Sequence, residues 1–386
     1  AFVRLGDDFP PEFAVFCREH SHWLDDYSLF LILKQEFAQQ SWTKWPIEFR
    51  SRDKKALVAF AADHEKQVDY IKFEQFLFFS QWNKLRAVAT QKGISLFGDM
   101  PIYVGHDSAD VWANQTCIEL DGVTGEPLLV AGVPPDYFSD TGQRWGNPLY
   151  KWKLAGKKNT SLYRWWQNRF KQIGTLVDLV RIDHFRAFEA YWSIDQEEET
   201  AVNGTWVQGP GAPFFKAMQP SLVGREINSE DLGVITPEVE ALRDTFGFAG
   251  MKILQFSFGD DATNSYLPHN YETTNTLVYA GTHDNDTAVG WFLDPETPDT
   301  SKDSFRRLAN SDGSSPHHDF NRLALSSTAR LAIIPMQDVL GFGTDCRMNR
   351  PGTVDNNWLW RCGAEYLSEA VATYLFDEVS FYNRLS

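Results

Sequence analysis

Apolar residues recur at helical spacing in the first quarter of the chain and form short runs after it. Phe73, Phe76 and Val88 follow one face of a helix, and Gly93 stands where such a helix would end. The pattern predicts that residues 12–93 are mainly helical.

Six short runs with strand character follow, and each leads into a polar segment. We expect strands at residues 94–97, 179–183, 226–230, 251–258, 276–281 and 332–336. Helical or irregular segments separate the runs, and parallel strands need long crossovers of this kind. The spacing therefore indicates a parallel α/β protein.

The polar residues just past the predicted strands decide between two parallel folds. A TIM barrel places its chemistry at these strand ends. An open, doubly wound sheet would show a similar pattern, but no Gly-x-Gly-x-x-Gly or Walker loop accompanies any run. We predict a TIM (β/α)8-type barrel with helical and loop insertions. Residues 1–93 are interpreted as an insertion subdomain, and residues 94–386 as the main part of the catalytic barrel.

Charge and composition narrow the possible partners. The formal net charge of the 386 residues is −16. Nucleic acids and anionic membrane surfaces are bound through clustered positive charge, so we expect neither as a partner. The longest apolar run, Leu29 to Leu33, is far too short to span a bilayer. Aromatic residues make up 15% of the chain and could stack on sugar rings, although most such rings belong to protein cores.

The cysteines show no metal-binding pattern. Cys17, Cys117, Cys346 and Cys362 are dispersed, without the spacing of a zinc site. Isolated thiols suit a reducing compartment. We expect a cytoplasmic protein, or one of the plastid stroma if the source is eukaryotic.

Three acids at strand ends are candidates for catalysis: Asp183 in Arg-Ile-Asp-His-Phe-Arg, Glu230 in Asn-Ser-Glu-Asp-Leu-Gly, and Asp284 in Gly-Thr-His-Asp-Asn-Asp-Thr. Retaining glycosidic-bond chemistry uses two carboxyl groups about 5 Å apart, one that attacks the anomeric carbon and one that donates and then accepts a proton. Arg181 lies two positions before Asp183, on the same side of a strand, where its charge favours an ionised nucleophile.

The residues by themselves leave other interpretations open. Arg181 and Asp183 can form a plain salt bridge, and Asp231 competes with Glu230 for any proposed role. His283 and Asp284 fall short of the three ligands of a catalytic zinc site, so we expect no metal and no cofactor. The Gly-x-Ser-x-Gly motif of serine hydrolases does not occur.

A series of motifs resembles, in the same order, the amylomaltases, which are the 4-α-glucanotransferases or disproportionating enzymes of the α-amylase clan. The motifs are Gly98-Asp-Met-Pro-Ile-Tyr-Val, Pro134-Pro-Asp-Tyr-Phe-Ser, Gly142-Gln-Arg-Trp-Gly-Asn-Pro-Leu-Tyr150, Arg181-Ile-Asp-His-Phe-Arg186, Ser229-Glu-Asp-Leu-Gly233, Leu267-Pro-His-Asn-Tyr271, Gly281-Thr-His-Asp-Asn-Asp-Thr287 and Arg347-Met-Asn-Arg-Pro-Gly352. Each motif alone is weak, but the combination is very specific.

The resemblance implies roles for single residues. It makes Asp183 the nucleophile, Glu230 the general acid/base and Asp284 the third carboxylate, which holds sugar hydroxyls and stabilises the transition state. Further substrate-binding positions around the pocket are Arg181, His283 and Asn349.

The resemblance also implies a lid over the bound glucan within residues 134–150. Its aromatic loop is formed by Trp145 together with Pro135, Asp136, Tyr137 and Phe138. A lid that excludes water while it stacks an acceptor favours transfer over hydrolysis. The alternative is an ordinary proline-rich surface loop.

The chain departs from the family's pattern at its start. Amylomaltases begin with a segment that carries the first two barrel strands, and its motifs are not found before residue 12. We therefore expect a chain that lacks this part and holds barrel strands three to eight only. Two local departures, Ala187 in place of a glycine and Ile227–Ser229 in place of a more apolar strand, leave all three carboxyl groups in place.

The predicted function is the transfer of α-1,4-glucan segments between maltooligosaccharides or starch-derived glucans, by a retaining double displacement. One alternative is an α-glucan hydrolase of the same clan, and another is a truncated, non-catalytic glucan-binding protein. The sequence does not indicate an oligomeric state.

Overall fold

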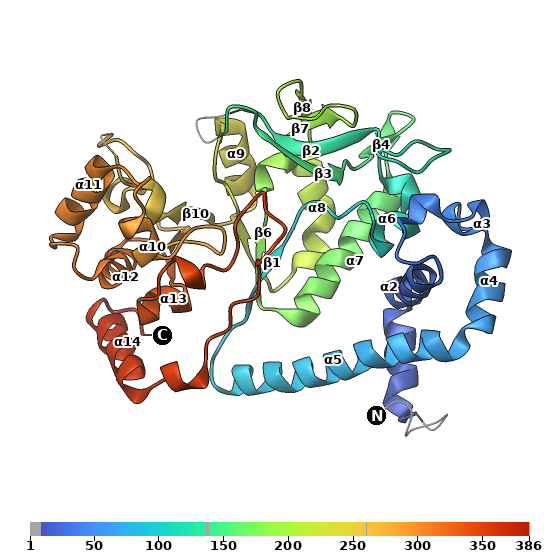
Figure 1. Ribbon diagram of the computed structural model, residues 1–386, viewed down its shortest axis with the longest axis horizontal. Coiled ribbons are helices and arrows are strands. Elements are labelled where there is room, and N and C mark those ends of the chain that lie inside the picture. Colours follow the sequence, from blue (N-terminus) through green and yellow to red (C-terminus); the bar gives the residue numbers. More distant parts are fainter. Residues whose placement is uncertain (1–8, 136–138, 260, 386) are drawn as a thin grey trace. The chain divides into compact units, whose positions relative to one another are not determined.

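The chain divides into two compact units, and the computed structural model describes residues 9–135, 139–259 and 261–385 (Figure 1). One unit comprises residues 1–227 and the other residues 228–386. Their boundary falls within strand β9 (Glu226–Ser229). The interpretation of residues 1–93 as an inserted subdomain stays a prediction.

Helices fill the start of the first unit. They are α2 (Pro11–Glu36), α3 (Ile47–Arg50), α4 (Lys54–Asp63) and α5 (Glu65–Gln91). Pro11 opens α2, where the missing amide costs no hydrogen bond, and Asp53 caps α4 by accepting two backbone amides. The rings of Phe13 and Phe73 meet edge to face with their centroids 5.6 Å apart, so aromatic packing joins α2 to α5.

A parallel sheet positions the candidate residues of this unit. Its order is β1 (Phe97–Met100), β6 (Leu179–Ile182) and β9. Helix α7 (Thr160–Leu176) lies in the crossover from β1 to β6, and α8 (Gly211–Leu222) in the crossover from β6 to β9. A Cβ atom on Gly98 would lie 2.8 Å from the side chain of Val177, so β1 needs glycine there.

A second sheet of the first unit was not expected from the apolar runs. It is antiparallel, with the order β3 (Gln143–Pro148), β2 (Leu129–Val133), β7 (Ala190–Asp195) and β8 (Thr205–Gln208). Part of the predicted lid segment, residues 134–150, is therefore a strand, because β3 forms backbone hydrogen bonds with β2. The unit also contains α6 (Ala109–Ala113), the hairpin of β4 (Lys153–Leu154) and β5 (Lys157–Lys158), and 3₁₀ helices at Trp42–Lys44, Gln115–Cys117 and Phe185–Phe188.

The second unit is built on another parallel sheet, with the order β10 (Gly250–Ile253), β11 (Thr276–Tyr279) and β12 (Leu331–Ile333). Its helices are α9 (Pro237–Thr245), α10 (Ala288–Leu293), α11 (Asp299–Ala309), α12 (Pro316–Ser326), α13 (Met336–Leu340) and α14 (Glu369–Phe381), with 3₁₀ helices at Leu254–Phe256, Pro268–Asn270, Thr344–Cys346 and Ala364–Tyr366. Val278, Phe305 and Phe320 belong to a fully buried cluster that packs helices against the sheet.

Each of the six predicted strands overlaps an observed one, but none has the expected bounds. The first is displaced, since β1 covers Phe97–Met100 instead of residues 94–97, and the other five end one to five residues earlier than expected. Strand β10 ends at Ile253 because the amide of Ser257 folds back onto the carbonyl of Leu254 and closes a 3₁₀ turn. Strand β12 ends at Ile333, and Met336 begins α13 directly after Pro335. The mixed α/β class is confirmed, while the assignment to barrel strands three to eight stays a prediction. Among the described helices, none is both long and apolar enough to cross a membrane.

Candidate active site

Asp183 follows β6 directly and forms an ion pair with Arg181. Arg181 Nη1 lies 2.9 Å from Asp183 Oδ1 and 2.6 Å from Asp99 Oδ2. The guanidinium is buried, whereas the side chain of Asp183 is 41% exposed. A guanidinium in contact with a carboxylate stabilises its charged form, which a nucleophile needs. The pair is thus a salt bridge as well as a candidate reactive site.

Asp99 is a member of this group that the sequence reasoning missed. It stands on β1 directly opposite Arg181 in the parallel register. The available signal was its place in the Gly98-Asp-Met-Pro motif at a strand end. Asp99 holds the guanidinium from one side, so that Arg181 is oriented toward Asp183.

The ring of Trp145 lies close to the same strand end. Trp145 meets His184, the residue after Asp183, edge to face with their centroids 4.8 Å apart. Its indole N–H donates to Gln143 Oε1 at 3.1 Å, which orients the ring on β3. The structure therefore brings together Arg181 and Asp183, and places Trp145 against the residue that follows Asp183. The predicted lid residues Asp136, Tyr137 and Phe138 lie outside the described residues.

His184 is held in a left-handed backbone conformation, with φ of 48°. Desolvation by burial, with a smaller contribution from the charge of Arg186, lowers the pKa of His184 to about 3. The imidazole is therefore neutral at physiological pH and presents an uncharged surface to Trp145.

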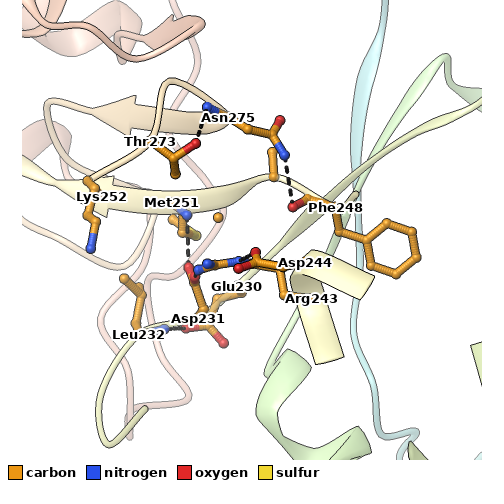
Figure 2. Close-up of polar contacts among 12 residues, drawn as sticks. Glu230, Asp231, Leu232, Arg243, Asp244, Phe248, Met251, Lys252, Thr273 and Asn275 are labelled. Atoms are coloured by element: carbon orange, nitrogen blue, oxygen red, sulfur yellow. Dashed lines mark hydrogen bonds and ion pairs between the residues drawn. The ribbon is translucent and has the colours of Figure 1, made fainter. Parts of the chain in front are cut away.

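Glu230 follows β9 directly and is buried, with 9% of its surface exposed. Its Oε1 accepts the amide of Leu232 at 3.0 Å (Figure 2). This bond fixes one carboxylate oxygen within the turn that follows the strand.

Asp231 is committed to the fold through both of its oxygens. Oδ1 accepts the amide of Met251 on β10 at 2.8 Å, and Oδ2 pairs with Arg243 of α9 at 2.6 Å (Figure 2). A Cβ atom on Gly250 would lie 2.6 Å from Asp231 Oδ2, so this glycine makes room for the carboxylate. Burial raises the pKa of Asp231 above its ordinary value despite these partners. Both Asp231 oxygens are thus engaged within the fold, which favours Glu230 over Asp231 for the acid/base role, and that role stays a prediction.

Asp284 lies in the segment that follows β11 and is held by several side chains. Asn349 Nδ2 donates to Asp284 Oδ1 at 2.6 Å, and His283 Nε2 lies 3.4 Å from Asp284 Oδ2. Arg347 donates to the Asp284 carbonyl at 2.6 Å and to the Asn349 carbonyl at 2.9 Å. The structure thereby brings together His283, Asp284 and Asn349, as predicted, and adds Arg347 as the residue that ties their backbones together.

Trp358 is a second residue that the sequence reasoning missed. Its ring lies against His283 with their centroids 5.0 Å apart, and 60% of its surface is exposed. The backbone is left-handed, with φ of 62°, and the Trp358 amide donates to the Met348 carbonyl at 2.8 Å. A large residue is rarely held in this conformation, so the surrounding chain presents the indole at some energetic cost.

The described residues contain no group of three or more His, Cys, Asp or Glu side chains that could hold a metal ion. All four cysteines are free thiols. The contacts divide the candidate residues. In the first unit, Arg181 joins Asp99 to Asp183, and Trp145 lies against the next residue, His184. In the second unit, His283, Asp284, Asn349 and Trp358 form one contact group, and Glu230 stands apart in the turn after β9.

Comparisons with known proteins agree on one family. The family model described as 4-alpha-glucanotransferase matches residues 4–365. The 4-alpha-glucanotransferase of Synechocystis is 48% identical over 374 residues, which are 97% of this chain and 73% of that protein. The enzyme of the same name from Thermus thermophilus is 46% identical, over 94% of this chain and 73% of its own length.

A solved structure gives the same result. The amylomaltase from Streptococcus agalactiae, determined in complex with acarbose, superposes with a TM-score of 0.90 at 35% sequence identity, over 97% of this chain and 75% of that chain. These comparisons give no support to the expectation that the family's beginning is missing; the chain spans about three quarters of the length of the relatives it matches.

Proposed function

Because the chain belongs to the 4-alpha-glucanotransferase family, we propose that it transfers α-1,4-glucan segments between maltooligosaccharides by a retaining double displacement. The observation that carries the chemical part of this proposal is the accessible Asp183 carboxylate, held by the buried guanidinium of Arg181 at a strand end. Neither a metal nor a cofactor takes part in the proposed reaction.

In the first step, an oxygen of Asp183 forms a bond to the anomeric carbon while the glycosidic bond to the leaving oxygen breaks. Glu230 donates its proton to that oxygen, and a glycosyl-enzyme remains. In the second step, the 4-hydroxyl of an acceptor sugar attacks the anomeric carbon, Glu230 takes up the hydroxyl proton, and Asp183 leaves. Double inversion retains the configuration.

Asp284 serves as the third carboxylate in this proposal. Asn349 fixes one of its oxygens, and Arg347 fixes its backbone. A carboxylate held in this way can accept hydrogen bonds from sugar hydroxyls that become more acidic in the transition state. Trp358, which is exposed beside His283, supplies an apolar face on which a sugar ring can stack.

The fold and location of the chain remain part of the proposal. We assign the six predicted strands to one (β/α)8-type barrel, a choice supported by the parallel pairing of β1 with β6, by the parallel pairing of β10, β11 and β12, and by the intervening helices. A cytoplasmic or stromal location is supported by the four free thiols.

Product analysis with pure maltotriose tests the function. We expect glucose together with maltopentaose and longer chains, because each transfer lengthens one molecule as it shortens another. Glucose and maltose without longer chains would show a hydrolase instead. Calorimetric binding of maltotriose without any product would show a non-catalytic glucan-binding protein.

Replacement of Trp145 tests the lid. We expect Trp145→Ala to raise the ratio of hydrolysis to transfer about threefold to tenfold, because loss of the indole removes a stacking surface for the acceptor and admits water. The ratio is measured as reducing ends per longer chain formed. The control is Trp206→Ala on β8, an indole of similar exposure, which should leave the ratio unchanged. An unchanged ratio in Trp145→Ala would argue against the lid.

A further inference from the structure

A buried acid lies beneath the segment that carries Asp284. Asp338 belongs to α13 and has no solvent-exposed surface. Its Oδ1 accepts the amide of Ala288, the first residue of α10, at 2.7 Å. Its Oδ2 has no hydrogen-bond partner within the described part of the chain. A fully buried carboxyl group with one neutral donor and one unpartnered oxygen is more stable as the neutral acid than as the carboxylate.

Asp338 fixes the end of the segment that places Asp284. Ala288 follows Asp284 by four residues, and side chains between them form hydrogen bonds that hold the segment. Asn285 accepts the amide and hydroxyl of Thr282, and Asp286 accepts the hydroxyl of Thr344. These hydrogen bonds restrict the backbone between Asp284 and the start of α10. A displacement of Ala288 should therefore also displace Asp284.

The side chains around Asp338 are mainly acidic or uncharged. Asp286, from the segment itself, acts on Asp338 and disfavours its ionisation. From α12, Asn321 donates to the Asp338 carbonyl, while Asp319 and Arg322 pair with each other. His317 of the same helix, close to Gly341, has its pKa lowered to about 4 by burial and is neutral at physiological pH. Within the described residues, no cation pairs with Asp338.

Burial raises the pKa of Asp338 from 3.8 to about 7. The hydrogen bond from Ala288 opposes this shift, and the charge of Asp286 adds to it. The group therefore changes its charge near neutral pH. Ionisation places a second negative charge beside Asp286 without a compensating cation, and the segment relieves this repulsion by admitting water or by moving.

We propose that Asp338 is a positioning residue for Asp284: through the Ala288 amide it holds the start of α10 and residues 282–287, and its ionisation beside Asp286, with no cation to compensate the charge, displaces this segment and lowers glucan transfer. The inference rests on the proposed function, in which Asp284 stabilises the transition state. Asp338 itself touches no substrate.

The stability of the protein should follow the same titration. Because the pKa of Asp338 is raised in the folded state, its contribution to stability is fully present below about pH 4 and is lost as the pH rises through about 7. We expect the Tm of the wild-type protein to fall over this range by more than that of Asp338→Asn. The amide keeps the acceptor for Ala288 and cannot ionise.

The decisive experiment measures kcat/KM for maltotriose transfer across pH 5–9 in the wild-type protein and in Asp338→Asn. Loss of activity above neutrality should be weaker in the variant, so that the ratio of variant to wild-type activity rises about tenfold between ~pH 6 and ~pH 9. The matched control is Asp319→Asn, a second buried acid of this unit, which pairs with Arg322 and should keep the wild-type profile.

Three outcomes separate the possibilities. A shifted profile in Asp338→Asn alone supports the proposal. An identical profile in wild type and Asp338→Asn overturns it, and assigns the alkaline loss to another group. If the wild-type protein forms no transfer product at any pH, the proposed function is wrong. The role of Asp338 is then tested by calorimetry, which measures the affinity of the wild-type protein and of Asp338→Asn for maltotriose at pH 6 and pH 8. Equal pH dependence of that affinity in both proteins would again overturn the role of Asp338.

Discussion

Replacement of Asp183 by asparagine should abolish glucan transfer, with a loss of at least about 10⁴-fold in kcat/KM for maltotriose. The amide has nearly the same shape as the carboxylate but cannot form the covalent glycosyl-enzyme. Arg181 would keep its contact with Asp99, so we expect the fold to survive. The measurements are product chromatography for turnover and the Tm for folding.

The control for this loss is Asp195→Asn, an exposed acid at the end of β7 in the same unit. It should retain wild-type activity. Intact-protein mass spectrometry adds a direct test, since wild type treated with an activated glycosyl fluoride should carry a covalent sugar and Asp183→Asn should not. Normal turnover in Asp183→Asn, or a covalent sugar on it, would refute the assignment of the nucleophile.

Replacement of Glu230 by glutamine should lower transfer from maltotriose by about 10³-fold, within the range typical of general acid–base catalysis. The loss should depend on the leaving group. Fluoride leaves without protonation, so a maltosyl fluoride should still react with Asp183 in this variant. Deglycosylation needs a general base, and the glycosyl-enzyme should therefore accumulate and be visible by its mass.

The neighbouring acid supplies the matched comparison. Asp231→Asn breaks the buried pair with Arg243 and should lower the free energy of unfolding by roughly 2 kcal/mol, while the remaining folded protein reacts normally. If instead Asp231→Asn showed the dependence on the leaving group and Glu230→Gln did not, the roles of the two acids would be exchanged.

The two acids also show how far sequence reasoning reaches. The resemblance selected Glu230, but spacing alone could not separate it from Asp231, because adjacent residues at a strand end share the same local pattern. The separation came from Arg243 and Met251, which lie 12 and 20 residues further along the chain. Asp99 was missed for a related reason, since its pairing with Arg181 across 82 residues depends on strand register.

The antiparallel sheet of the first unit illustrates a second limit. Strands β3 and β8 carry few consecutive apolar residues, so a search for apolar runs passes over them. Their structure depends on backbone hydrogen bonds to neighbouring strands, and those neighbours are set by the fold. The strands β6, β10, β11 and β12 were found because they coincide with short apolar runs that end in polar segments. Strand β9 is less apolar and was found by its acidic ending, and β1 was found only through the apolar run that leads into it.

The sequence by itself determined the α/β class, the six parallel strands, the family and the identities of the candidate acids. These features depend on local periodicity and on residue types in order, which are present in the chain before it folds. Only the tertiary structure decided that Asp231 pairs with Arg243, that Trp358 lies against His283, and that Asp338 accepts the first amide of α10. Each of these depends on burial and on contacts between distant segments, because desolvation and hydrogen bonding act on groups that only folding brings together.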